Sequence, residues 1–530
     1  MNKRLILILN IISLFSLLSC VTENYEADSN EDEVVQHITF KTSEKVKQAN
    51  AYIDDNMYKV STEYRNTYHM MPPIGWCNDP NGFSEFNGKY HLFYQFNPYS
   101  AAWGPMHWGH QTTTDFIKWE LQDVALAPDK SYENPSGCFS GTALVKDDIL
   151  YVTYTAASEF QNQAMAYSSD GITFKKLPAL IISDKNLPSN FSNSDFRDPK
   201  LFERDGKYYI IAGTIDKINH NRVLALFTSN NLFGPWKYCD YIYSTKNVPG
   251  MLECPDLTTI GAYDVLIMSP QSISSSKIYE YQNRDSCVYL IGNLSTVSNK
   301  FYKSDSSVKL EEFDKGFSFY APQTVTTSDG RVVLIAWMGN WVDPITTTND
   351  GWCGAMTLPR ELKIIDNHIY QTPVREINNY IFNEKKVDDL ELSNETLILN
   401  GFESRTSKIT LDIDLSTMLG KEKAGIEVYK GSDYSTKIYY DNELGCLVFD
   451  RNNCGSILSG VRYCKVEPID NKIKLEIYLD VNSVEIFIND GYYTMTGTVF
   501  APSGNNNVAL FSENGTTNFS NISKAEIFVQ

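Results

Sequence analysis

One β-rich unit recurs five times before residue 375, and this repeat limits the folds that the chain can adopt. Each unit holds an aromatic and β-branched run bounded by Gly, Asp or Asn turns, as is typical of β-strands. The runs lie at residues 88–94, 147–154, 206–211, 262–268 and 329–336. Their spacing of roughly 55–70 residues is typical of solenoids, propellers and arrays. We therefore predict a five-bladed β-propeller over residues 64–375, with a sandwich of separate hairpins as the alternative.

A different strand pattern follows the fifth unit. Residues 376–389 are predicted to be a short linker that has room for one helix. Short alternating strands then begin, and Asn489-Asp490-Gly491 between two apolar runs is a strong β-hairpin signal. These features predict a C-terminal β-sandwich over residues 390–530. The expected fold is therefore all-β, a five-bladed propeller followed by a β-sandwich.

Three acidic residues, Asp79, Asp198 and Glu253, precede the runs of three units at equivalent positions. Any one of them alone would be interpreted as a turn residue, because Asp-Pro and Asn-Gly are ordinary turn dipeptides. A calcium loop starting at Asp79 lacks the remaining spaced oxygen ligands. Equivalent positions in radially arranged units converge, so the recurrence predicts that three carboxylates meet near the axis.

Such a set of carboxylates fits the hydrolysis of a glycosidic bond, which needs one carboxylate as nucleophile or base and another as acid. Asp79 is the candidate nucleophile, because its Asn, Pro and Gly neighbours form a tight turn that admits substrate. Glu253 is the candidate acid/base, since its side chain is longer, Cys254 is a less polar neighbour and burial should raise its pKa. Asp198 is the candidate stabiliser of a positively charged transition state, held ionised by Arg197.

The motifs around these residues resemble those of glycoside hydrolase family 32, the invertase, inulinase and levanase family. The resemblance rests on residues 76–82, 94–98, 103–110, 139–141, 197–199, 253–255, 319–323 and 358–362. It implies a propeller with a sandwich, and a retaining reaction through a fructosyl-enzyme intermediate without metal or cofactor. It also implies a fructan, fructo-oligosaccharide or sucrose substrate.

The resemblance further implies a fructose-binding site lined by Asn78, Gln95, Trp103, Phe139, Ser140 and Arg197. Trp103 and Phe139 would form apolar walls, although packing within a blade is the alternative for each aromatic ring. Cys77 stands where the family usually has Met. This departure removes no group that the reaction requires.

The N-terminus has the pattern of a bacterial lipoprotein leader. Lys3 and Arg4 precede an apolar stretch too short to span a bilayer, which predicts a signal peptide over residues 1–19. Cys20 resembles a lipidation site, with an ordinary secretory signal as the alternative. Residues 20–63 are predicted to be an acidic, disordered tether. The expected location is a lipid anchor in the cell envelope, at the outer membrane and exposed at the surface.

Composition excludes some other classes of protein. A formal net charge of −19 argues against nucleic-acid binding, which needs a basic surface. Of ten cysteines, the lipidation of Cys20 would leave nine. An odd number, with Cys77 and Cys254 beside candidate catalytic residues, argues against a disulfide framework, and no spacing resembles a metal-ligand pair.

The sequence thus predicts a lipid-anchored β-fructosidase. An endo-acting fructanase and a fructosyltransferase would use the same residues, so they remain alternatives. A non-catalytic fructan-binding lipoprotein is a remote alternative, because it would be favoured by a missing carboxylate and all three are present. The motifs slightly favour cleavage at chain ends over cleavage inside the chain. They do not separate β2,1 from β2,6 linkages or predict an oligomeric state.

Overall fold

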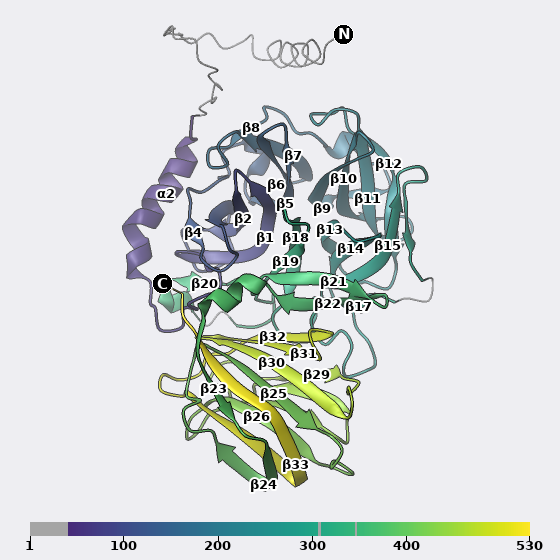
Figure 1. The fold of residues 1–530 in the computed structure, drawn as a ribbon. Coiled ribbons are helices and arrows are strands. Elements are labelled where there is room, and N and C mark those ends of the chain that lie inside the picture. The colour runs from purple at the N-terminus through teal and green to yellow at the C-terminus, as the bar shows by residue number, and fades with distance from the viewer. Residues whose placement is uncertain (1–40, 306–308, 345–346, 530) are drawn as a thin grey trace. The chain divides into compact units, whose positions relative to one another are not determined.

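The computed structural model describes residues 41–305, 309–344 and 347–529, which belong to one compact unit (Figure 1). The predicted signal peptide, Cys20 and most of the N-terminal half of the predicted tether lie outside the described residues. Within them, strands dominate and one α-helix occurs. No helix of the described residues is long and apolar enough to cross a membrane.

Five antiparallel sheets of four main strands form the N-terminal part of the structure. The first blade holds β1 (Gly75–Phe86), β2 (Lys89–Asn97), β3 (His107–Thr113) and β4 (Glu120–Leu121). The second holds β5 (Gly137–Lys146), β6 (Ile149–Ala157), β7 (Gln161–Ser168) and β8 (Lys175–Lys176). The third holds β9 (Phe191–Arg204), β10 (Lys207–Asp216), β11 (Asn221–Ser229) and β12 (Lys237–Thr245).

The last two blades complete the ring. The fourth holds β13 (Leu252–Ile260), β14 (Tyr263–Pro270), β15 (Val288–Ser295) and β16 (Lys300–Lys303), with β17 (Glu311–Glu312) on β15. The fifth holds β18 (Tyr320–Thr326), β19 (Val332–Trp337), β21 (Arg360–Ile365) and β22 (His368–Pro373). The short strand β20 (Trp352–Cys353) pairs in parallel with β1.

The first strands of the five blades contact one another in a closed circle, from β1 through β5, β9 and β13 to β18 and back to β1. The propeller prediction is therefore confirmed. The five repeated runs of the sequence become the second strands, β2, β6, β10, β14 and β19, which explains their apolar character. Their buried side chains fill the spaces between adjacent blades, as in the cluster of Phe93, Trp108, Val152 and Tyr154 between the first two.

The one α-helix corrects the prediction of a disordered tether. Helix α2 (Glu44–Asn56) begins at Ser43, whose hydroxyl accepts a hydrogen bond from the backbone N–H of Val46. Val46, Ala49 and Ile53 share one helical face and are buried in the same cluster as core residues of the first and fifth blades. The tether prediction is therefore wrong over residues 44–56, because an apolar stripe at helical spacing lies within this polar segment.

The C-terminal part is one continuous eleven-stranded sheet with a buried apolar core. Its strands are β23 (Ile381–Val387), β24 (Leu390–Ile398), β25 (Ser407–Asp414), β26 (Lys423–Lys430), β27 (Thr436–Asp441), β28 (Cys446–Asp450), β29 (Val461–Lys465), β30 (Lys472–Asp480), β31 (Ser483–Ile488), β32 (Tyr493–Thr498) and β33 (Asn507–Ile527). The long strand β33 pairs with β23, β24, β25 and β26, which joins the sheet into a sandwich.

The predicted linker over residues 376–389 is only partly a connection. Residues Arg375–Tyr380 form a 3-10 helix, but Ile381–Val387 form strand β23 and pair with β33. The sandwich therefore begins about nine residues earlier than its predicted start at 390. This pairing joins residues far apart in the sequence, so the local pattern did not reveal it.

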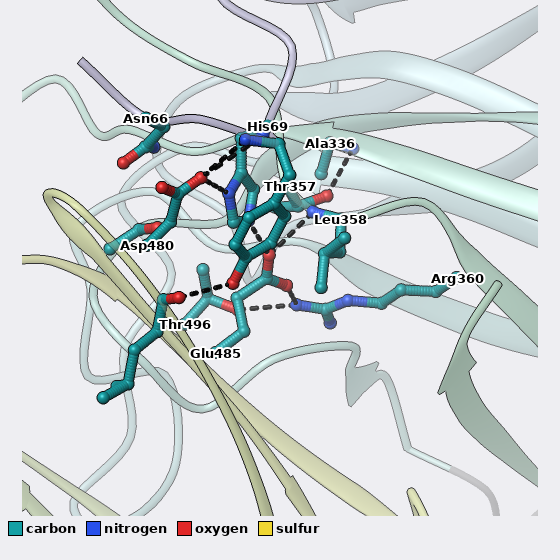
Figure 2. A network of polar contacts seen from close by, with 12 residues as sticks. Asn66, His69, Ala336, Thr357, Leu358, Arg360, Asp480, Glu485 and Thr496 are labelled. Carbon is teal, nitrogen blue, oxygen red and sulfur yellow. Dashed lines mark hydrogen bonds and ion pairs between the residues drawn. The ribbon is translucent and has the colours of Figure 1, made fainter. Parts of the chain in front are cut away.

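A buried network of charged groups joins the propeller to the sandwich (Figure 2). The guanidinium of Arg360 donates hydrogen bonds of 2.6 Å to Glu485 and 2.6 Å to Thr496. His69 lies 2.8 Å from both Asp480 and Glu485 through its two ring nitrogens. All of these charged side chains are buried, so each depends on its partners for the solvation that water would give.

The His69 contacts predict a pH-dependent stability. Burial alone would lower the pKa of His69, but its hydrogen bonds to Asp480 and Glu485 outweigh burial and raise the pKa to about 9. A raised pKa stabilises the fold fully below the unfolded-state pKa of about 6.5, and this contribution is lost as pH rises through about 9. We expect the free energy of unfolding to fall by about 3 kcal/mol between pH 6.5 and 9.5. Denaturant unfolding at a series of pH values measures this, and a His69→Gln variant should flatten the curve.

Candidate active site

The inner strand of every blade is irregular at its motif. Pairing with the second strand slips between residues 77 and 80, 138 and 141, 197 and 200, 253 and 256, and 320 and 323. A β-bulge bends a strand and re-aims its side chains. Asp198, Cys254 and Ala321 have positive φ angles of 65°, 45° and 51° within these bulges. Each of the five equivalent bulges therefore removes a short segment from the hydrogen-bonded ladder of its blade. The five segments lie around one axis.

Two of the three predicted carboxylates meet at one cysteine. The Oδ2 atom of Asp79 accepts a 2.7 Å hydrogen bond from the Ser140 hydroxyl and lies 3.4 Å from the Cys254 sulfur. The Oδ2 atom of Asp198 accepts a 2.9 Å hydrogen bond from the Cys254 backbone N–H and lies 3.6 Å from the same sulfur. Four different blades thus bring Asp79, Ser140, Asp198 and Cys254 together, and the register of the repeat predicted the convergence of the two carboxylates.

Glu253, the third carboxylate, is held at both oxygens. The Arg197 Nε atom donates to Oε1 at 2.9 Å, and the Tyr320 hydroxyl donates to Oε2 at 2.6 Å. Arg197 was expected to hold Asp198 ionised, but it forms an ion pair with Glu253, and burial and the charge of Glu253 outweigh its effect on the pKa of Asp198. The β-bulge at residues 197–200 aims the Arg197 side chain toward the fourth blade, where Glu253 lies.

Burial and mutual repulsion shift the acid strengths in this site. Burial raises the pKa of Asp79, and the nearby charge of Glu253 adds to this, while the Ser140 hydrogen bond works in the opposite direction. Burial and the charge of Glu253 raise the pKa of Asp198 to about 7, although Arg197 opposes the shift. Closely spaced carboxylates cannot all ionise easily, so the site retains a proton near neutral pH.

One buried atom of Asp79 is left without a partner. Its Oδ1 oxygen makes no hydrogen bond with any described residue, although Oδ2 is fully engaged. A buried carboxylate oxygen without a donor is unfavourable unless another group uses it. This oxygen is therefore the Asp79 atom that keeps an unused acceptor position.

The six side chains that the family resemblance implies as fructose-binding differ in how directly they contact the carboxylates. Ser140 and Arg197 contact Asp79 and Glu253 directly, as described above. The Asn78 Oδ1 atom accepts from the indole N–H of Trp76 at 2.7 Å, and the Gln95 amide donates to the backbone carbonyl of Cys138 at 3.1 Å. Trp103 and Phe139 meet edge to face with ring centroids 6.0 Å apart, and Trp103 is 48% exposed. Trp103 is therefore not part of a blade core, whereas Phe139 packs against a buried cluster that includes Trp76 and Tyr320.

Trp103 lines a cavity of about 290 Å³. It is lined by side chains of the first and fifth blades and by sandwich residues, among them Trp76, Trp103, Trp337, Trp341, Leu458 and Phe500. Trp341 stacks on Trp76 with centroids 5.9 Å apart. Aromatic faces suit the apolar faces of sugar rings, so the cavity has room and chemistry for a sugar beyond the carboxylates.

Tyr320 and the tryptophans of the fifth blade were not among the predicted site residues. The sequence did contain a signal for Tyr320. Tyr320 precedes Ala321-Pro322 just as Glu253 precedes Cys254-Pro255, so the two residues stand at equivalent positions. Trp337 and Trp341 carry no such signal, since they reach the cavity from the end of strand β19 and from the segment after it. Among the described residues, no group of three or more His, Cys, Asp and Glu is arranged to hold a metal, and the nine described cysteines are unpaired.

Comparison with known proteins agrees with this geometry. A model of the glycosyl hydrolases family 32 N-terminal domain matches residues 69–373, and the C-terminal model of that family matches residues 376–526. The chain is 34% identical over 479 residues to a sucrose-6-phosphate hydrolase of Zymomonas mobilis, covering 86% of this chain and 91% of that protein. It is 30% identical over 487 residues to a levanase of Bacillus subtilis, covering 86% of this chain and 69% of that protein.

Solved structures show the same two-domain architecture. A β-fructofuranosidase of Bombyx mori aligns with a TM-score of 0.77 and 30% identity, covering 91% of this chain and 98% of that one. Fold, site and family models together define a glycoside hydrolase. The chain belongs to glycosyl hydrolase family 32.

Proposed function

We propose that this protein is a retaining β-fructosidase that releases β-linked fructose from fructans, fructo-oligosaccharides or sucrose. The observation that carries the proposal is the meeting of Asp79, Asp198 and Glu253 through Cys254, Ser140 and Arg197. The names of its relatives support the substrate class, because they include a sucrose-6-phosphate hydrolase, a levanase and a β-fructofuranosidase.

In the proposed first step, the free Oδ1 atom of Asp79 attacks the anomeric carbon of fructose. Glu253 donates a proton to the glycosidic oxygen as its bond to that carbon breaks, and a fructosyl-enzyme ester forms. In the second step, Glu253 takes a proton from water, the water oxygen attacks the same carbon, and the Asp79 carboxylate leaves. Asp198 accepts hydrogen bonds from sugar hydroxyls and stabilises the positive charge of each transition state. Two inversions retain the configuration, for which the carboxyl groups of Asp79 and Glu253 should stand about 5–5.5 Å apart.

A timed product profile on levan, inulin and sucrose tests the proposal. Fructose alone from the first time point supports cleavage at chain ends and reveals the preferred linkage. A ladder of oligosaccharides instead means endo cleavage, and longer products at high sucrose mean that fructose is transferred to sugar. No release from any of the three contradicts the proposed function.

Tyr320 is proposed to position the acid/base residue. Because its hydroxyl is the only group among the described residues that donates to Glu253 Oε2, Tyr320→Phe should free that oxygen to rotate. We expect kcat on sucrose to fall about tenfold with little change in KM.

Tyr154→Phe is the matched control for Tyr320→Phe, because its buried hydroxyl also donates to a glutamate, Glu133, at 2.6 Å. That variant should keep the wild-type kcat and KM on sucrose. Equal effects of the two substitutions would mean that Tyr320 acts on stability alone.

We also propose that Cys20 carries a lipid that anchors the enzyme in the outer membrane. The support is the apolar stretch before Cys20 and the acidic segment after it. A Cys20→Ser variant, expressed in a Gram-negative host, should move from the membrane fraction to the soluble fraction and lose labelling by radioactive palmitate. Unchanged membrane association with no labelling of the wild type would contradict lipidation.

A further inference from the structure

The largest cavity described for this protein lies away from the carboxylates. It has a volume of about 680 Å³, within the range of cavities that hold small molecules. Its walls come from β15 and β17 of the fourth blade, from β22 of the fifth blade and from the β31–β32 hairpin of the sandwich. It shares no lining residue with the carboxylate site, which is built on the innermost strands. Figure 1 shows β22 beside β32, in agreement with their contacts.

Aromatic rings form one wall of this cavity. Tyr492 stacks face to face on His368, with centroids 3.8 Å apart and planes 9° from parallel. Tyr493 lies 4.6 Å from Tyr492 at 62°. Tyr492 and Tyr493 are partly exposed, so their rings are available at the cavity surface. Rigid aromatic rings with a polar edge suit ligands that have both apolar and hydroxylated faces.

The polar groups of the cavity favour a neutral ligand with many hydroxyls. Three glutamates and two lysines line it, so the opposite charges almost cancel. Glu311 accepts the hydroxyl of Tyr289 at 2.7 Å and lies 3.1 Å from His368, which holds the aromatic wall in place. The Tyr492 hydroxyl has no hydrogen-bond partner recorded among the described residues, and Lys309 stands exposed at the rim. Both can bind sugar hydroxyls, whereas an ionic ligand would find no excess of charge.

We propose that this cavity is an ancillary binding site for a fructan chain, which holds the polymer while the carboxylate site cuts it. The inference rests on the proposed function for the choice of polymer, but not for the existence of the site. Because the walls come from both domains, the sandwich contributes directly to holding the polymer. A short substrate such as sucrose should not need the cavity, whereas levan or inulin should gain affinity from it.

Polymer binding tests the site without relying on turnover. Electrophoretic retention in native gels containing levan or inulin is measured in an Asp79→Ala background, so that polymer is not cut. We expect Tyr492→Ala to weaken retention about three- to tenfold through loss of the stacked ring. Lys309→Ala should weaken it less, and because Lys309 is exposed this variant does not endanger the fold. Tyr302→Ala is the matched control, since this tyrosine is 57% exposed on β16 and does not line the cavity.

Kinetics in the otherwise wild-type enzyme give the second readout. Tyr492→Ala should lower kcat/KM on the retained polymer by a similar factor and leave kcat/KM on sucrose within about twofold. The proposal is overturned if the parent is not retained by either polymer, if neither cavity variant weakens retention, or if sucrose and polymer are affected equally. A protein that binds fructan through Tyr492 but hydrolyses none would refute the proposed function and keep the ancillary site.

Discussion

Replacing Asp79 by alanine is expected to lower kcat on sucrose and on fructans by roughly 10⁴-fold, while the protein stays folded. The physical reason is that Asp79 is the proposed nucleophile, and its buried Oδ1 atom has no hydrogen-bond partner among the described residues. The raised pKa of this buried carboxyl also means that its removal relieves repulsion from Glu253. Thermal unfolding should therefore change little, and initial rates of fructose release measure the effect.

Two further measurements separate a nucleophile from a merely structural residue. Azide is small enough to take the place of the missing carboxylate, so it should restore turnover of Asp79→Ala and yield a fructosyl azide of inverted configuration. Asp148→Asn is the matched control, because Asp148 is an exposed residue at the turn of a repeated unit and its positive φ of 56° suits asparagine. An Asp79→Ala enzyme with full activity would refute the assignment.

Removing Glu485 is expected to be the most destabilising single change at the domain interface. Its carboxylate accepts from Arg360 at 2.6 Å, from His69 at 2.8 Å and from the Leu358 backbone N–H at 2.7 Å (Figure 2). Burial would raise the pKa of Glu485, but the charge of Arg360 and the His69 hydrogen bond outweigh it and lower the pKa. Glu485→Ala leaves these partners without their acceptor in a buried site. We expect a loss of about 3–5 kcal/mol in the free energy of unfolding.

Denaturant unfolding of Glu485→Ala should be compared with that of Glu443→Ala. The latter removes an exposed ion pair, in which Glu443 lies 2.9 Å from Lys421. Exposed pairs contribute at most about 1 kcal/mol, so this control should unfold close to the wild type. If both variants lose the same small amount, the buried network does not hold the domains together. A sandwich that unfolds separately in Glu485→Ala would show that the network couples the two domains.

Local patterns were enough for the architecture. The second strand of each blade is mostly buried, and its run of aromatic and β-branched residues was visible without any alignment of distant segments. The same holds for the hairpin at residues 489–491, where turn chemistry determines the pairing. Helix α2 was missed, because its polar composition outweighed three apolar residues spaced for one face.

The sequence by itself determined the five-unit repeat, the sandwich and the convergence of Asp79, Asp198 and Glu253, because each follows from short-range periodicity and from equivalence between units. Only the tertiary structure decided that Arg197 pairs with Glu253 and that Tyr320 completes the set of groups around it. It also decided the cavities and the buried interface network. These depend on bulges that re-aim side chains and on contacts between residues far apart in the chain, and neither leaves a regular pattern in the sequence.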